Sequence, residues 1–119
     1  MDCKIEPTKN TPCIVINSAE GEVEFWGRSS PESALEFYNP IIETIKNIST
    51  EQLSLSFHMQ YFNTSTSKCF FKLIKESAQT RDNHLTVNWF YEDWDDDMRE
   101  NGEDFEDSIE EASFNFFSE

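Results

Sequence analysis

The chain has 119 residues, a length that fits one domain with its own hydrophobic core. Its 24 acidic and 9 basic residues give a formal charge of −15, which argues against direct binding to nucleic acid or to an anionic membrane surface. Twelve carboxylates and one arginine lie between Glu92 and Glu111, so most of the acidity is regional. The partners expected for such a chain are other proteins.

The sequence contains no apolar run of membrane-spanning length and no basic and apolar N-terminal signal, so we expect a soluble protein of the cytoplasm. Cys3, Cys13 and Cys69 are odd in number and widely spaced. This pattern fits reduced thiols better than a disulfide framework and gives no support to a redox function.

The first third of the chain predicts a β-hairpin followed by a helix. Residues 13–16 and 22–26 are short strand-like runs, and the four residues 18–21 between them suit a turn. Ser29 and Glu32 have capping-box spacing, which predicts a helix start at residues 29–32. We expect Pro40 to kink or divide this helix. The predicted apolar stripe of the helix consists of Ala34, Leu35, Tyr38, Ile41, Ile42, Ile45 and Ile48.

The remainder alternates between strands and helices. Residues 53–61 show the clearest period-two pattern of the chain, and residues 85–91 repeat it. Between them, Phe70, Leu73, Ile74, Ser77 and Ala78 mark the buried side of a helix. Residues 95–105 predict a short acidic helix weakened by Gly102, and residues 114–116 predict an edge strand. The order predicts a single α/β domain over residues 1–119, with a mixed sheet, an N-terminal hairpin and parallel strands joined by helical crossovers.

Four consecutive hydroxyls, Thr64 to Ser67, follow the strand at 53–61 and precede a helix. The backbone N–H groups at a helix start are unpaired and carry a partial positive charge, so a phosphate added to one of these hydroxyls can be held there. Simple N-capping by Ser or Thr is the alternative interpretation. Local sequence treats the four hydroxyls almost equally.

Catalytic and metal-binding patterns are weak. His58 and His84 belong to no recognisable catalytic arrangement, and the Gly-rich phosphate-binding motifs are absent from the sequence. Asp93, Asp95 and Asp97 alternate like the start of a calcium loop, but Met98 stands where such a loop needs Gly. A small acidic domain that binds a divalent metal or acts as an enzyme through these aspartates is the alternative hypothesis.

Three ordered blocks resemble a known family. Residues 27–40 (Gly-Arg-Ser-Ser-Pro-Glu-Ser-Ala-Leu-Glu-Phe-Tyr-Asn-Pro), residues 61–68 (Tyr-Phe-Asn-Thr-Ser-Thr-Ser-Lys) and residues 89–105, from Trp-Phe-Tyr-Glu-Asp to Gly-Glu-Asp-Phe, look like the SiaC family of bacterial regulatory phosphoproteins. The resemblance extends from about residue 5 to residue 117. Ser30, Ser33 and Trp94 depart from the usual family pattern.

The resemblance implies a fold similar to the STAS domains of anti-sigma-factor antagonists and a non-enzymatic, partner-switching function without a cofactor. It implies that Thr64 is the phosphorylated residue. We expect the partner-binding surface to consist of Asn63, Thr64, Ser65, Ser67 and Lys68. In this hypothesis Asn63 caps or shapes the turn, Ser65 and Ser67 satisfy unpaired N–H groups of the helix start, and Lys68 pairs with the phosphate. The unmodified form would bind and activate a diguanylate cyclase and so raise cyclic di-GMP. A dedicated protein kinase and a PP2C-like phosphatase would set the phosphorylation state. A constitutive adaptor without phosphorylation is a further possibility.

Overall fold

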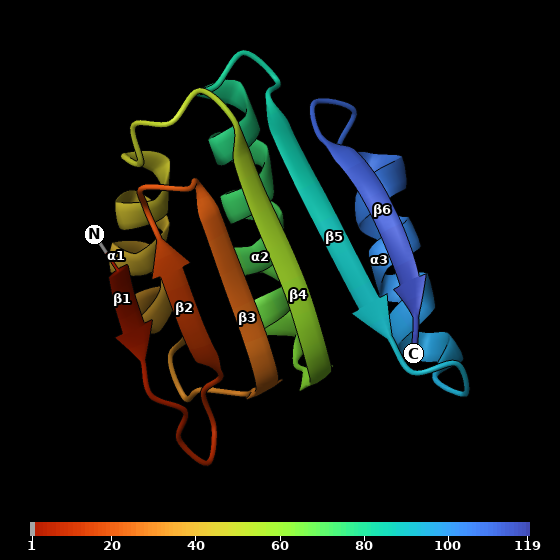
Figure 1. Ribbon diagram of the computed structural model, residues 1–119. Helices are drawn as coiled ribbons and strands as arrows, with labels where there is room; N and C mark the ends of the chain where they lie inside the picture. The colour runs from red at the N-terminus through yellow and green to blue at the C-terminus, as the bar shows by residue number, and fades with distance from the viewer. Residues whose placement is uncertain (1) are drawn as a thin grey trace.

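The computed structural model describes residues 2–119, and the side chains of residues 4–119. Its strands form one mixed sheet in the order β1-β2-β3-β4-β5-β6, antiparallel from β1 to β3 and parallel from β3 to β6 (Figure 1). The elements are β1 (Asp2–Ile5), β2 (Cys13–Asn17), β3 (Glu22–Ser29), α1 (Ala34–Lys46), β4 (Leu53–Phe62), α2 (Thr64–Gln79), β5 (Leu85–Tyr91), α3 (Asp96–Ser108) and β6 (Ser113–Ser118). The predicted mixed sheet with its hairpin and helical crossovers is confirmed, and β1 is an addition to it.

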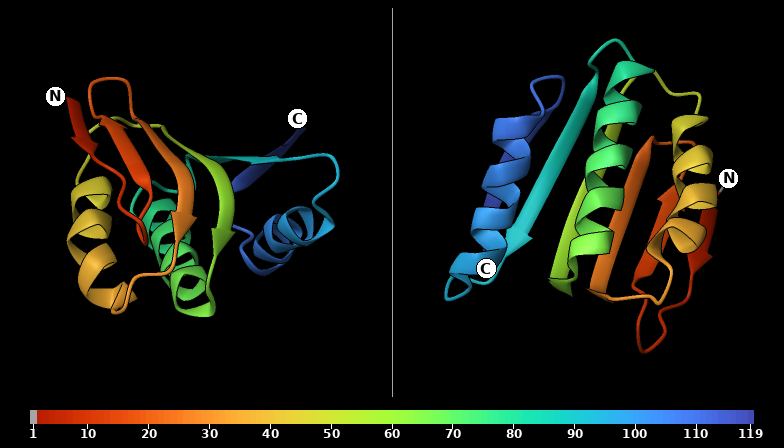
Figure 2. Two further views of the ribbon diagram at one scale, coloured as in Figure 1. Left: turned by 90° about the horizontal axis from the view of Figure 1, so that it is seen from below. Right: turned by 180° about the vertical axis from the view of Figure 1, so that it is seen from behind.

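All three helices lie on the same face of the sheet (Figure 2). The reason is topological, because each of α1, α2 and α3 joins a strand to the next parallel strand in the same direction across the sheet. Right-handed crossovers that always advance in one direction place every helix on one side. The opposite face of the sheet is therefore left without a helical layer.

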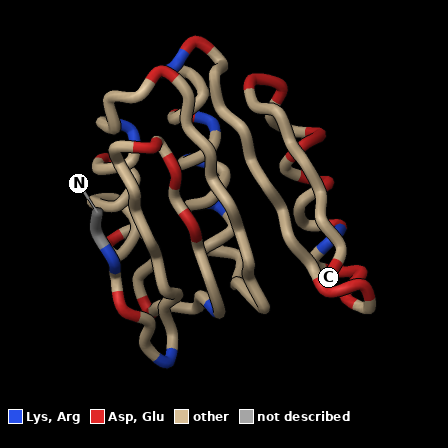
Figure 3. The backbone as a smooth tube through the Cα atoms, in the orientation of Figure 1, with Lys and Arg blue, Asp and Glu red and all other residues tan. Residues whose placement is uncertain are grey.

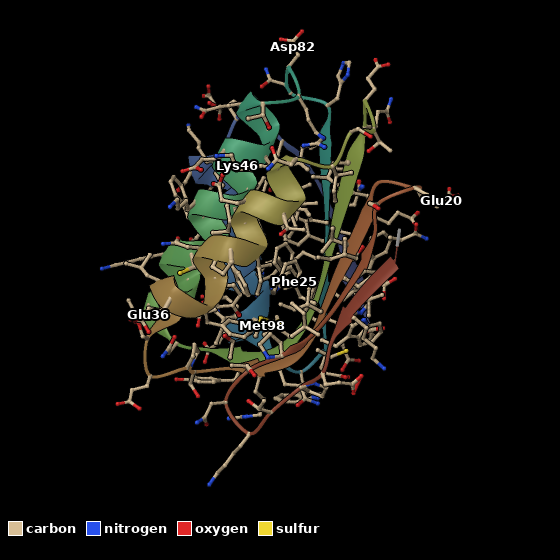
Figure 4. The ribbon with its side chains drawn as sticks, turned by 90° about the vertical axis from the view of Figure 1, so that its left-hand side faces the viewer. Glu20, Phe25, Glu36, Lys46, Asp82 and Met98 are labelled. Carbon is tan, nitrogen blue, oxygen red and sulfur yellow. The ribbon has the colours of Figure 1, made fainter. Side chains whose placement is uncertain are left out.

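The core fills the space between the sheet and the helices, and Phe70 of α2 is at its centre. The Phe70 ring lies 4.9 Å from Phe57 and 5.6 Å from both Phe25 and Tyr38, measured between ring centroids. Figure 4 shows Phe25 and Met98 pointing into this layer, whereas Glu20, Glu36 and Asp82 lie at the outside. The period-two strand pattern predicted for residues 53–61 is confirmed from Leu53 to Met59, where Leu53, Leu55, Phe57 and Met59 are buried, whereas Tyr61 at its end is exposed.

The predicted start of the first helix is wrong. Helix α1 begins at Ala34, its N-cap position is Ser33, and Ser29 is the last residue of β3. Local capping-box spacing was outweighed by burial, since the Ser29 side chain is completely buried among hydroxyl partners. Pro40 does not divide the helix, which continues to Lys46. Leu35 is 60% exposed, so it does not belong to the buried stripe, whose other members are buried.

Gly102 has a packing role that its low helix propensity does not reveal. The indole Nε1 of Trp89 donates a hydrogen bond of 2.9 Å to the carbonyl oxygen of Met98, one turn before Gly102 in α3. A Cβ built on Gly102 would lie 2.5 Å from the indole ring, closer than real Cβ atoms approach other atoms. The absence of a side chain at Gly102 therefore lets α3 dock on β5. Gly102, which was expected to weaken the helix, helps to position it.

None of the helices in the part of the chain from residue 2 to 119 is long and apolar enough to cross a membrane. Cys13 and Cys69 are free thiols, and the side chain of Cys3 lies outside the described residues. Burial of the Cys69 thiol raises its pKa, which keeps it in the unreactive protonated form.

The packing of Gly102 against Trp89 can be tested by whether Gly102→Ala raises or lowers the free energy of unfolding. Alanine in a helix is normally more stable than glycine by about 1 kcal/mol. Because the new methyl group would meet the Trp89 ring, we expect Gly102→Ala instead to lower the free energy of unfolding by about 1–3 kcal/mol, as overpacking does. Urea unfolding measures the difference. Glu106→Ala, at an exposed position of the same helix, is the control and should stay within about 0.5 kcal/mol.

Candidate functional site

The junction between β4 and α2 is shaped by one asparagine. Asn63 is the N-cap of α2, and its Oδ1 accepts the backbone N–H of Thr66 at 2.9 Å. Its backbone carbonyl accepts the N–H of Ser67, and its own N–H donates to the carbonyl of Ser29 at the end of β3. The predicted capping role of Asn63 is confirmed. The predicted caps at Ser65 and Ser67 are wrong, because Asn63 supplies the side-chain cap.

A buried cluster of three hydroxyls lies directly under this junction. Ser29 Oγ is 2.6 Å from Tyr38 Oη on α1 and 2.9 Å from Thr66 Oγ1 on α2. Thr66 Oγ1 also donates a hydrogen bond of 3.4 Å to the carbonyl oxygen of Ser29. The cluster joins β3, α1 and α2, and each buried hydroxyl has partners that offset the cost of removing it from water.

Burial separates the four hydroxyls that the sequence could not rank. Thr66 is fully buried and engaged in the cluster, and Ser67 is half-buried. Thr64 and Ser65 are exposed in the first turn of α2. A modifying enzyme can therefore reach the hydroxyls of Thr64 and Ser65 without unfolding the helix, whereas it cannot reach that of Thr66.

The helix start has the chemistry needed to hold an anion. Asn63 takes the N–H groups of Thr66 and Ser67, so the backbone N–H groups of Thr64 and Ser65 are left without a partner among the described residues. Helix α2 has no acidic residue in its first turn, and the exposed Lys68 lies one turn further on. A phosphate on Thr64 would meet free donors and the positive end of the helix dipole.

Tyr38 is the ionisable member of the hydroxyl cluster. Burial raises the pKa of its phenol well above the ordinary value, the hydrogen bond with Ser29 lowers it, and the nearby Cys69 raises it. Desolvation is the largest of the three effects, so Tyr38 stays neutral in the folded protein throughout the physiological range. The cluster under the junction is therefore uncharged and insensitive to pH near neutrality.

The carboxyl end of β4 also borders an acidic hollow of about 470 Å³ against α3. Asp95, Asp97, Glu100 and Asp104 contribute carboxylates to its lining. Asp95 caps α3, since its Oδ1 accepts the N–H of Met98 at 3.0 Å. Residues 4–119 bring together no group of three His, Cys, Asp or Glu side chains that could hold a metal, so the alternative based on Asp93, Asp95 and Asp97 gains no support.

Ser29, Tyr38 and Arg28 complete the surroundings of the junction, and none of them was expected in this place. Ser29 and Tyr38 support α2 from below, and the guanidinium of Arg28 lies 5.1 Å from the ring centroid of the exposed Tyr61. A short Gly-Arg-Ser run at a strand end was the available signal. That run predicted only a helix cap, because Tyr38 and Thr66, the partners of Ser29, lie 9 and 37 residues further along the chain.

The model of the SiaC family of regulatory phosphoproteins matches residues 5–119. The chain belongs to this family. A comparison with curated proteins found no match. The SiaC-family fold is also seen in solved structures, where a chain from the crystal structure of the diguanylate cyclase SiaD in complex with its activator SiaC, from Pseudomonas aeruginosa, aligns with a TM-score of 0.87. That alignment has 22% identity and covers 99% of this chain and 100% of the other.

Two further structures of SiaC from Pseudomonas aeruginosa, one of them the apo form, each align with a TM-score of 0.81 and 23% identity. They cover 100% of this chain and 99% and 98% of their own. The likeness at this identity concerns the fold. It shows that the six-stranded sheet and three helices described above are the SiaC architecture, and that this SiaC-family protein spans all of it.

The buried phenol predicts a change in stability with pH. At pH 7 we expect Tyr38→Phe to lower the free energy of unfolding by about 1 kcal/mol, because Ser29 loses a hydrogen bond. Since the folded-state pKa of Tyr38 is raised, its phenol ionises only in the unfolded chain as the pH rises above about 10, which destabilises the wild type. The difference in the free energy of unfolding between wild type and Tyr38→Phe should therefore become smaller above that pH.

Urea unfolding at pH 7 and at pH 10.5 to 11 measures the two differences. Tyr61→Phe removes a phenol from an exposed ring and is the matched variant at pH 7, where its effect should stay within about 0.5 kcal/mol. A Tyr38→Phe deficit that stays constant or grows with pH would show that Tyr38 is not held neutral by burial.

Proposed function

We propose that this SiaC-family protein is a non-enzymatic switch whose unphosphorylated β4–α2 surface binds and activates a diguanylate cyclase, and that phosphorylation of Thr64 releases the cyclase. The observation that carries the proposal is the position of Thr64, an exposed hydroxyl in the first turn of a helix whose capping is done by Asn63. The SiaC of Pseudomonas aeruginosa, which shares the fold, is the activator of the diguanylate cyclase SiaD.

Phosphorylation changes the surface and leaves the fold intact. The phosphate brings nearly two negative charges to the start of α2, where unpaired N–H groups and the helix dipole favour an anion. The hydroxyl cluster below the junction is buried and needs no rearrangement to accommodate it. A partner packed against Thr64 would instead have to bury a dianion that its own surface does not pair, which costs several kcal/mol.

The other residues of the junction have separate roles in this proposal. Asn63 holds the helix start, Ser65 and Ser67 contribute polar contacts to the client, and Lys68 pairs with the phosphate across one helical turn. A dedicated protein kinase and a PP2C-like phosphatase act on Thr64, and its exposure leaves room for both. The single domain of residues 1–119 carries this function in the cytoplasm and uses no cofactor.

Binding to a diguanylate cyclase from the same organism tests the proposal. We expect unphosphorylated wild type and Thr64→Ala to bind with dissociation constants within about threefold of each other, because neither buries a charge. Thr64→Glu should bind at least about tenfold more weakly, since a buried unpaired charge costs more than 1.4 kcal/mol. Calorimetry measures the affinities, and product formation by the cyclase measures activation.

Ser33→Glu is the matched control for Thr64→Glu. It adds the same charge at the start of α1, where Ser33 is exposed and its side chain makes no cap hydrogen bond. We expect it to bind like wild type. Equal binding by wild type, Thr64→Ala and Thr64→Glu would overturn the switch at Thr64.

A further inference from the structure

The uncovered face of the sheet has a composition unlike the rest of the chain. Strands β4, β5 and β6 contain no Asp, Glu, Lys or Arg, although 28% of all residues are charged. Figure 3 shows these strands uncoloured, with acidic positions gathered along α3. An uncovered sheet face is ordinarily polar and charged. Strands β4, β5 and β6 therefore form an uncharged part of this face on a protein of charge −15, whereas the neighbouring β3 contributes Glu24 and Arg28.

Four aromatic rings cross this face in a continuous row, one from each of the strands β3 to β6. Trp26 stacks on His58 with ring centroids 3.7 Å apart, His58 stacks on Phe90 at 3.9 Å, and Phe90 stacks on Phe117 at 4.7 Å. Strands are about 4.8 Å apart, so the row is about 14 Å long. We call these four residues the aromatic row.

The two ends of the aromatic row are open to solvent. Trp26 is 44% exposed and Phe117 is 43% exposed, whereas the faces of His58 and Phe90 are covered by their neighbours. Burial between the rings lowers the pKa of His58, against the opposing effect of Glu119 and Glu24, so the imidazole continues the row as a neutral ring. The ring faces that a partner can cover are therefore those of Trp26 and Phe117.

A hollow of about 630 Å³ adjoins the row. The ladder between β4 and β5 runs only to Phe57 and Trp89, and the hollow lies beyond it, with Met59 and Gln60 on one side and Tyr91 on the other. Trp94, which is 75% exposed, also lines it. Met59, Tyr91 and Trp94 give a partner's apolar side chain contacts in this hollow, and a side chain placed in a pocket is the usual form of an interface anchor.

The rim of the hollow determines the charge of its occupant. Glu92, Asp95 and Glu119 contribute three carboxylates, and Arg28 contributes one cation whose guanidinium lies over Tyr61. Carboxylates repel phosphate-bearing ligands, which disfavours nucleotides and lipid headgroups. An arginine of a partner can pair with these carboxylates and stack on the outer face of Phe117 or Trp26.

We propose that the aromatic row and its hollow form a second docking surface, which binds a basic segment carrying arginine and an apolar anchor on the diguanylate cyclase. The inference rests on the proposed function for the identity of the client. Arg28 connects this surface to the switch, because it lines the hollow and also covers Tyr61, three residues before Thr64. The client then contacts the β4–α2 junction and the uncovered sheet face together.

Calorimetric titration of unphosphorylated protein with the cyclase tests the surface. We expect the double variant Trp26→Ser/Phe117→Ser to bind at least about tenfold more weakly, because both terminal ring faces are lost. Phe71→Ser removes an exposed ring from α2 on the other side of the molecule and should change the affinity by less than about threefold. Urea unfolding verifies that all variants are folded.

A charge reversal gives a second, independent measurement. Glu92 and Glu119 are exposed, and the double variant Glu92→Lys/Glu119→Lys should weaken binding at least about tenfold and reduce its dependence on salt. Glu36→Lys, on α1, is the control and should bind like wild type (Figure 4).

The outcomes separate the two proposals. If wild type does not bind the cyclase, the proposed function is wrong, and so is the proposal that the cyclase docks on this surface. If wild type binds and both double variants bind equally well, the docking surface is wrong and the switch stands. Sedimentation of the protein alone should show a monomer. If wild type is a dimer and Trp26→Ser/Phe117→Ser is a monomer, the aromatic row is a contact between two copies, which would overturn the proposal.

Discussion

The hydrogen bonds of a single buried serine hold the candidate switch together. Ser29 ends β3, and its hydroxyl meets Tyr38 of α1 and Thr66 of α2, while its carbonyl accepts the N–H of Asn63. These contacts fix where β4 ends and α2 begins. Because a buried hydroxyl without a partner is costly, the three elements are held in one arrangement. Thr64 is therefore presented on a rigid helix start, with Thr66 turned inward.

The direction of the crossovers explains why one face of the sheet is uncovered. Three helices on one face bury the core, and the same topology leaves a sheet face free to carry the aromatic row. The acidic residues, by contrast, are concentrated on α3 and the loop before it. The protein thus combines an aromatic row on the uncovered face with an acidic rim. The switch residue Thr64 follows the carboxyl end of β4, which contributes His58 to the row. Packing of Gly102 against Trp89 holds α3, which carries many of these carboxylates, on the neighbouring strand β5.

Periodicity predicted most of the fold, because alternation and helical spacing report directly on which side chains are buried. The strands at β4 and β5, the helix α2 and the mixed sheet followed from it. Contacts between distant residues could not be predicted in that way. Ser29 has the spacing of a helix cap, yet its partners are 9 and 37 residues away. Likewise, the four hydroxyls look alike in sequence, and only burial separates Thr66 from Thr64. The role of Thr64 itself came from family resemblance.

Site-resolved mass spectrometry of the protein isolated from its own host tests the central claim most directly. The hydroxyls at the start of α2 differ in accessibility, so the site of any phosphate reports on the geometry described above. The account predicts a single phosphate on Thr64, in a fraction of molecules that changes with growth conditions, and none on Thr66. A phosphate on Ser65 or Ser67 in place of Thr64, or a chain that is never phosphorylated, would contradict it.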